Sequence, residues 1–142
     1  MARPLVFLAT AALVLGAFGL RTAHADDVTK LTITDQKVGT GSTARDDSEV
    51  AINYTGWLYD AKAQDHHGKK IDSSNDSGRP LTFTIGADQV VSGMDSGVKG
   101  MRVGGKREII VPSSMGYGRR GAGSDVPPNS ALVFDIELVE VH

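Results

Sequence analysis

The histidines of this 142-residue chain are its most obvious candidates for binding a metal or moving a proton. His66 and His67 are adjacent within residues 60–70, a polar stretch without hydrophobic period that predicts an exposed loop. Neighbours in such a loop rarely hold one metal ion together, and His142 is the only other histidine after residue 25. A Ser-His-Asp triad would likewise lack a base in an ordered segment. We therefore expect no metal site and no cofactor, and the lack of cysteine excludes thiolate chemistry and disulfides.

A glycine motif at residues 116–121, Gly-Tyr-Gly-Arg-Arg-Gly, matches the G-x-G-x-x-G pattern of dinucleotide-binding proteins. In those proteins the motif opens a helix inside a βαβ unit. Here residues 122–128 follow, Ala-Gly-Ser-Asp-Val-Pro-Pro, which cannot begin a helix soon enough. The match is interpreted as coincidental.

Aromatic residues are the remaining candidates for a binding site. Tyr54 comes late in one predicted strand, and Phe83 and Phe134 are on the apolar faces of two others, where plain core packing is an equally good explanation for Phe83. Tyr117 is different, because a tyrosine between two glycines in a long loop is poorly placed for the core. We expect it to offer its hydroxyl to a ligand.

The elements that must position these residues are mostly strands. Alternation of apolar and polar residues predicts five or so strands, within residues 28–38, 49–59 (broken at Gly56), 81–85, 106–111 and 131–141. Residues 90–101 instead show a helical period, with Val91, Met94, Val98 and Met101 on one face. Three glycines in that segment cost about 1 kcal/mol each relative to alanine, so the helix must be held by burial, and they let another layer approach closely. The prediction is an α+β domain: a bent antiparallel sheet around one short α-helix.

The first 25 residues have the pattern of a secretory signal peptide. A basic start is followed by an uncharged run from residue 5 to residue 20 and by Ala23-His24-Ala25, a small-x-small cleavage site. The run is short for a membrane span, so we expect cleavage, no membrane anchor, and a periplasmic or secreted domain at residues 26–142. Removing this segment takes away two arginines, so 13 basic and 17 acidic residues remain, a net charge of 13 − 17 = −4. That charge argues against nucleic acid as a partner.

Five stretches in order resemble the FKBP family of peptidyl-prolyl cis–trans isomerases, over about residues 28–141. They are Tyr54-Thr55-Gly56, Lys69-Lys70-Ile71-Asp72-Ser73-Ser74, residues 93–105, Gly116-Tyr117-Gly118 and residues 127–135 (Pro-Pro-Asn-Ser-Ala-Leu-Val-Phe-Asp). The resemblance is to small exported bacterial members in particular. It implies the same bent sheet and helix that the periodicity predicts.

The resemblance also implies an apolar pocket for proline-containing polypeptides. Its implied catalytic residues are Tyr54, Asp72, Tyr117 and Phe134, and its implied substrate-binding residues are Ile71, Leu81, Phe83, Val90, Val91 and Met94. The Val91 N–H and the Tyr117 hydroxyl would bond to ligand carbonyls. Asp72 would orient the Tyr54 hydroxyl or cap the turn at Ser73-Ser74, and both readings stay open.

Three positions depart from the family's usual pattern. Met94 is where a tryptophan commonly forms the pocket floor, and Ile71 and Leu81 are where phenylalanine is frequent. The pocket is thus expected to be apolar but softer, with reduced affinity for tacrolimus- or rapamycin-like macrolides. The expected function is isomerisation of Xaa-Pro bonds by a monomer. The alternative is a non-catalytic binding module or holdase chaperone that uses the same pocket.

Overall fold

The computed structural model of the protein describes residues 28–142, and the predicted signal peptide at residues 1–25 lies outside that range. Within the described part of the chain, no helix is long and apolar enough to cross a membrane.

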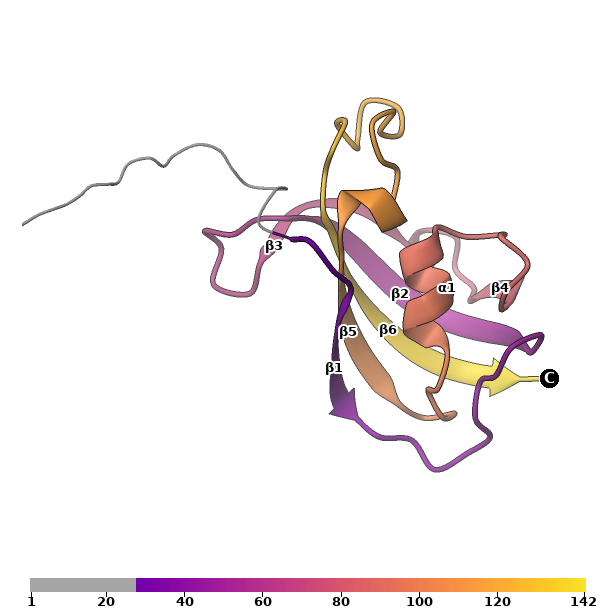
Figure 1. Cartoon of the computed structure of the whole chain (residues 1–142). Coiled ribbons are helices and arrows are strands. Elements are labelled where there is room, and N and C mark those ends of the chain that lie inside the picture. Colours follow the sequence, from indigo (N-terminus) through magenta and orange to yellow (C-terminus); the bar gives the residue numbers. More distant parts are fainter. Residues whose placement is uncertain (1–27) are drawn as a thin grey trace, which may run out of the picture.

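Residues 28–142 form one antiparallel sheet of six strands and one α-helix (Figure 1). The strand order is β1-β5-β6-β2-β3, and β4 pairs with the first half of β2. The strands are β1 (Thr32–Lys37), β2 (Glu49–Tyr59), β3 (His67–Ser73), β4 (Leu81–Thr84), β5 (Lys106–Val111) and β6 (Leu132–Val141). This confirms the predicted fold class, with one strand more than the alternation predicts.

The core lies on the inner face of the sheet, the face toward the helix. Leu132, Phe134, Ile136 and Leu138 of β6 are all buried there, because successive side chains of a strand point to opposite faces. In β5 the buried residues Ile109 and Val111 lie opposite Phe134 and Leu132. Each such side chain contributes about 1.5–3 kcal/mol to the stability of the fold through burial. The residues that make up the predicted alternation are therefore also the ones that stabilise the sheet most.

The helix α1 (Ser92–Val98) packs against β5 through its glycines. A Cβ added to Gly93 would lie 2.4 Å from Val111 Cγ1, and one added to Gly97 would lie 2.8 Å from Ile109 Cδ1. The close approach expected from the glycine spacing is therefore confirmed. The helix ends earlier than its period suggests, because Lys99 is extended and Gly100 has φ +91°, so buried Met101 lies beyond the last turn.

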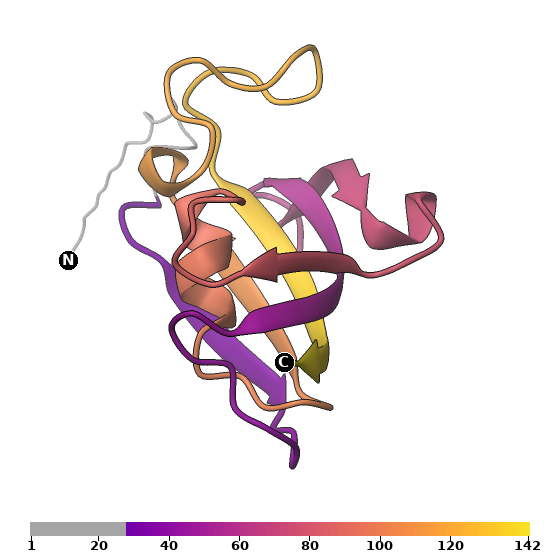
Figure 2. The same cartoon turned by 90° about the vertical axis from the view of Figure 1, so that its right-hand side faces the viewer.

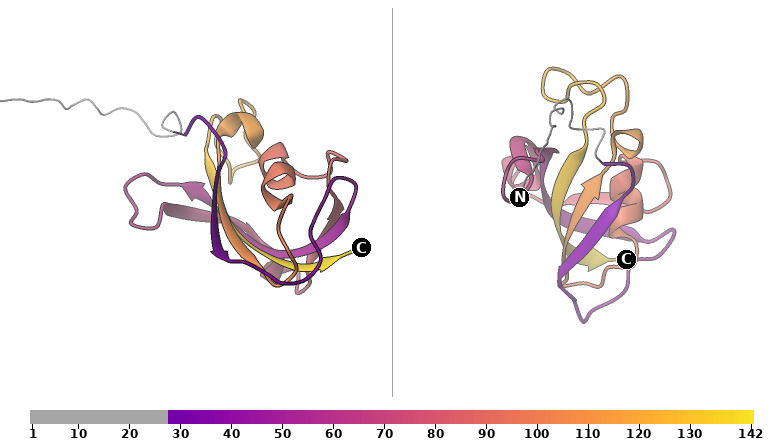
Figure 3. Two further views of the ribbon diagram at one scale, coloured as in Figure 1. Left: turned by 60° about the horizontal axis from the view of Figure 1, so that its bottom comes forward. Right: turned by 60° about the vertical axis from the view of Figure 1, so that its left-hand side comes forward.

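The sheet bends around this helix. Figure 2 and the left view of Figure 3 show the strands curving beneath α1 as a half-open cup. Arg107 of β5 fastens the helix end to the sheet: its guanidinium donates to Gly97 O at 2.8 Å, to Lys99 O at 3.2 Å and to Asp35 Oδ1 of β1 at 2.7 Å. The last carbonyls of α1 thus obtain partners that no further helical turn supplies.

Two local predictions are wrong. Residues 67–70 belong to strand β3 and not to an exposed loop, which is restricted to residues 60–66. As an edge strand, β3 pairs only with β2 and carries exposed lysines, so it lacks the alternation that reveals a half-buried strand. Strand β2 is also not broken at Gly56; its pairing with β3 only shifts register between Gly56 and Trp57, as at a β-bulge.

Candidate active site

Tyr54 and Phe134 form the aromatic centre of the candidate site. Tyr54 is in β2 and Phe134 in β6, and their ring centroids are 6.1 Å apart at an angle of 58°, a favourable tilted arrangement. Gly56 lies opposite Phe134 in the register of the two strands. A Cβ at Gly56 would lie 2.6 Å from Phe134 Cε1, so only glycine leaves space for the ring there.

Asp72, near the end of β3, holds both Tyr54 and the following turn. The Tyr54 hydroxyl donates a hydrogen bond to Asp72 Oδ2, while the Ser73 N–H donates to Asp72 Oδ1 at 2.8 Å. Ser73 in turn is the N-cap of the short 3₁₀ turn η4 (Ser74–Asp76), where its Oγ accepts from the Asn75 N–H at 3.2 Å. Of the two roles left open for Asp72, the structure therefore shows the bond to the Tyr54 hydroxyl, whereas the side chain that caps the turn is that of Ser73.

The two tyrosine hydroxyls of the site are held in the protonated form. Burial, the hydrogen bond to Asp72 and the charge of Asp72 together raise the pKa of Tyr54 well above its usual value. Burial and the charge of Asp72 also raise the pKa of Tyr117, so the Asp72 carboxylate acts on Tyr117 as well. Both phenols therefore remain hydrogen-bond donors throughout the neutral and mildly alkaline range.

Tyr117 lies in the long connection between β5 and β6, after the 3₁₀ turn η5 (Ser113–Met115), and is 41% exposed. Backbone hydrogen bonds order this loop, with Gly118 N–H donating to Ser113 O at 2.9 Å and Asn129 N–H donating to Gly118 O at 2.8 Å. The Ser92 hydroxyl at the start of α1 donates to Met115 O at 3.3 Å. The segment before Tyr117 is thereby fixed to the first turn of the helix, next to Val90 and Val91.

The residues predicted to form the apolar part of the site differ in how deeply they are buried. Met94 and Phe83 are buried, each 3% exposed, and belong to the central core cluster together with Phe134. Four others are partly buried and pack on that cluster: Ile71, Leu81, Val90 and Val91. The four partly buried residues keep surface available for a ligand above this buried layer.

The backbone at Val91 offers a free donor. Its carbonyl starts α1 by accepting from the Met94 N–H at 3.0 Å, whereas among residues 28–142 no hydrogen bond from the Val91 N–H is found. The first N–H groups of any helix lack intrahelical partners. The Val91 N–H is consequently available to a ligand carbonyl, as the resemblance implies.

A hollow next to Tyr54 joins three of the predicted site residues to several that the sequence did not indicate. Its lining is Tyr54, Asp72, Ser73, Ser74, Asp76, Ser77, Arg79, Pro80, Leu81 and Thr82. Ser74 was missed although it is buried and its Oγ accepts from the Tyr54 N–H at 3.0 Å. The serine pair before Asn75 was a turn signal, but its link to a strand twenty residues earlier could not be found from local pattern.

The arrangement is suited to binding and not to covalent chemistry. The lining just described contains no histidine, lysine or cysteine, and the tyrosines are poor acids and bases at neutral pH. The candidate site as a whole adds groups that lie outside this lining: the Tyr117 hydroxyl, the Val91 N–H and the apolar residues packed on the core. Such a site holds a substrate in one geometry by differential binding.

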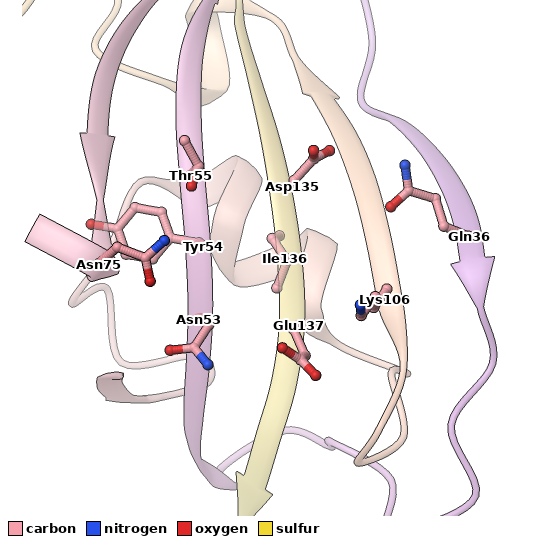
Figure 4. A pocket seen from close by; sticks show the side chains of 9 residues that line it. All are labelled: Gln36, Asn53, Tyr54, Thr55, Asn75, Lys106, Asp135, Ile136 and Glu137. Atoms are coloured by element: carbon pink, nitrogen blue, oxygen red, sulfur yellow. The ribbon is translucent and has the colours of Figure 1, made fainter. Parts of the chain in front are cut away.

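A second depression lies on the outer face of the sheet, away from α1 (Figure 4). It is lined mainly by polar residues: Gln36, Asn53, Tyr54, Thr55, Asn75, Lys106, Asp135, Ile136 and Glu137.

His67 lies in an ordered segment, since it begins β3 and its ring stacks on Trp57. The expectation that no histidine lies in an ordered segment is therefore wrong, because the loop ends at residue 66, four residues earlier than the polar composition suggests.

Comparison with known proteins identifies the family. The sequence profile of the FKBP-type peptidyl-prolyl cis-trans isomerases matches residues 40–139. The chain belongs to this family. An FK506-binding protein of Neisseria meningitidis serogroup A is 46% identical over 112 residues, which are 79% of this chain and 96% of that protein.

Solved structures agree with the FKBP assignment. FkpA from Escherichia coli superposes with a TM-score of 0.67 at 37% identity, over 78% of this chain and 47% of that one. A peptidyl-prolyl cis-trans isomerase from Pseudomonas syringae gives a TM-score of 0.65 at 34% identity, over 78% and 74% of the two chains. This FKBP is accordingly a peptidyl-prolyl cis–trans isomerase, of a family that binds proline-containing peptides and FK506-like ligands.

Proposed function

We propose that this isomerase accelerates Xaa-Pro rotation by non-covalent binding between the Tyr54–Phe134 pair and the Val90-Val91 segment. The observation that carries the proposal is the Tyr54 hydroxyl bonded to Asp72 while its ring packs on Phe134. That pair gives the pocket an apolar wall with a fixed polar edge.

The chemistry requires no nucleophile. Rotation about an amide C–N bond has a barrier of about 18–20 kcal/mol, because the twisted amide loses its resonance. Both isomers of an Xaa-Pro bond lie within roughly 1 kcal/mol of each other, yet exchange takes tens of seconds or longer. The planar amide carries more charge separation than the twisted one, so an apolar pocket disfavours the ground state relative to the transition state.

Each group then has a distinct role. Phe134, Val90 and Met94 hold the proline ring, with buried Met94 as the floor. The Tyr117 hydroxyl and the Val91 N–H bind the flanking carbonyls and fix the angle between them. Asp72 is a positioning residue that orients the Tyr54 hydroxyl from the edge of the site.

The clients proposed here are exported polypeptides, handled by a monomer in the periplasm or outside the cell. The leader at residues 1–25, with its Ala23-His24-Ala25 cleavage site, supports export. Sequencing the N-terminus of the protein recovered from the periplasm or medium should give Asp26 as the first residue. Recovery of an intact N-terminus from the cytoplasm alone would contradict it.

Macrolide binding is expected to be weaker than in members with an aromatic floor. Met94 replaces a large rigid surface by a flexible thioether chain, and Ile71 and Leu81 reduce the aromatic area further. Met94→Trp should therefore increase affinity for tacrolimus, measured by calorimetry. An unchanged or lower affinity in a folded Met94→Trp variant would contradict this account of the floor.

The direct test is NMR exchange spectroscopy on a short Xaa-Pro peptide with the purified chain. Wild type should accelerate exchange strongly. Tyr117→Phe, which removes only the hydroxyl, should lower kcat/KM about fivefold, the loss of one hydrogen bond of about 1 kcal/mol. Phe134→Leu should lower it roughly tenfold or more, because the ring that grips proline is lost.

The matched control is Tyr59→Phe, which removes a hydroxyl at the far end of β2 and should leave the rate unchanged. Phe134→Leu is preferred to Phe134→Ala because truncating a buried phenylalanine to alanine costs about 3–5 kcal/mol of stability. Peptide binding without acceleration by the folded wild type would contradict catalysis and favour the holdase alternative.

A further inference from the structure

The outer face of the sheet carries a cluster of metal-ligating side chains that the isomerase site does not use. His67 of β3, Glu108 of β5 and Asp135 of β6 each bring one ligand atom within 4.8 Å of the other two. All three are partly buried. Asp135 and Glu108 are opposite one another in the strand register, so the backbone fixes their approach.

The His67 ring is held in one orientation. It stacks on Trp57 with ring centroids 3.7 Å apart and planes 9° apart. Its Nδ1 is 3.3 Å from Asp65 Oδ2, and its Nε2 is 3.2 Å from Glu108 Oε2. A carboxylate on one ring nitrogen is the usual outer partner of a metal-binding histidine, because it leaves the other nitrogen as the ligand.

The carboxylates are incompletely paired. Asp135 Oδ1 is shielded from solvent and has no hydrogen-bond partner among the described residues. Both His67 nitrogens already face other carboxylates, so an ion pair with His67 alone leaves the Asp135 oxygen without a donor.

We propose that His67 Nε2, Glu108 and Asp135 bind a divalent zinc ion on the outer face of the sheet, with a water as fourth ligand. Imidazole nitrogen with carboxylate oxygen suits zinc, whereas calcium and magnesium prefer oxygen alone. Ligands at about 2.0–2.2 Å in a tetrahedron lie roughly 3.4 Å apart, near the 3.2 Å found between His67 Nε2 and Glu108 Oε2. Small side-chain rotations would bring Asp135 into the same shell.

A zinc ion at this place differs from the sequence-based expectation of no metal site. That expectation depended on both histidines lying in a loop, but His67 is a strand residue whose ring crosses toward β5. A bound ion would join β3 to β5 and β6. It would thereby stabilise the edge strand that also carries Asp72.

The test is a zinc titration of the chain prepared without a polyhistidine tag, followed by calorimetry. Trp57, the single tryptophan of the sequence, is a local reporter through its emission because it stacks on His67. We expect one saturable zinc ion per chain at this site. Glu108→Gln and Asp135→Asn should each weaken it at least tenfold, since each removes one of three protein ligands while leaving the Trp57–His67 stack.

Glu137→Gln is the matched control, because Glu137 is two residues from Asp135 on the same face but outside the cluster. It should bind zinc like wild type. Zinc should also raise the thermal midpoint of wild type and Glu137→Gln, with no rise for Asp135→Asn, and circular dichroism with EDTA verifies that each variant is folded. Absence of saturable binding, or equal binding by wild type and both ligand variants, would overturn the proposal and leave the cluster as an ion pair.

Discussion

At the scale of single residues, the isomerase site depends on side chains that serve the fold and the ligand at once. Asp72 bonds to the Tyr54 hydroxyl with one oxygen and to the Ser73 N–H with the other. Its position therefore fixes the aromatic wall relative to the turn η4. Removing the charge of Asp72 should lower the pKa of the Tyr54 hydroxyl while the pocket stays folded.

The ionisation of Tyr54 tests this coupling. Unfolded tyrosines ionise near pH 10, whereas the folded chain keeps the Tyr54 proton to higher pH. The unfolded state thus loses protons first, and stability should fall as pH rises above about 10. Asp72→Asn should bring the tyrosinate absorbance assigned to Tyr54 to lower pH, because the charge is gone while the burial remains. An identical titration in wild type and Asp72→Asn would contradict the assignment.

Gly56 tests the space reserved for Phe134. In Gly56→Ala the new Cβ would meet the Phe134 ring at 2.6 Å, so the ring must move. We expect a loss of about 1–3 kcal/mol in the free energy of unfolding and a lower kcat/KM. Chemical denaturation and peptide exchange measure the two effects. Gly78→Ala is the comparison for added side-chain bulk, since nothing lies within 4 Å of its Cβ position, although its positive φ adds a cost in stability. Undiminished activity in Gly56→Ala would show that the ring position is not critical.

At the scale of elements, the short helix is held by contact and not by propensity. It has seven residues, two of them buried glycines against β5, and is far too short to form alone. The position of Val90 and Val91 at its start consequently depends on how closely α1 approaches Val111 and Ile109. Backbone spacing, and not side-chain chemistry, positions that wall of the site.

Gly93→Ala should therefore destabilise the protein although alanine is the better helix former. Its Cβ would lie 2.4 Å from Val111 Cγ1, which forces the helix away from β5. We expect a loss of about 1–3 kcal/mol. The exposed neighbour Ser96→Ala should be neutral or slightly stabilising. Denaturant unfolding compares them, and partial recovery in Gly93→Ala with Val111→Ala would locate the clash. Equal stability of Gly93→Ala and Ser96→Ala would refute the packing argument.

At the scale of the whole molecule, the sequence predicted the elements that have a regular hydrophobic period. It did not predict the contacts between residues that only the order of strands in the sheet brings together. Five strands and the helix follow from alternation and the 3–4 spacing, whereas polar edge strand β3 carries neither signal. The isomerase residues were predicted through family resemblance, because Tyr54, Asp72 and Tyr117 share no local pattern. His67, Glu108 and Asp135 could not be connected in advance, since their proximity arises from strand order alone.

The central claim is that this isomerase works by apolar binding without proton transfer, and the most direct measurement is kcat/KM for peptide exchange in H₂O and in D₂O. The account predicts a ratio close to one, because no side chain of the site acts as acid or base in the rotation. A rate lowered by about twofold or more in D₂O at matched viscosity would mean that a proton moves in the slow step. That result would contradict the account and would require a catalytic acid or base at the pocket.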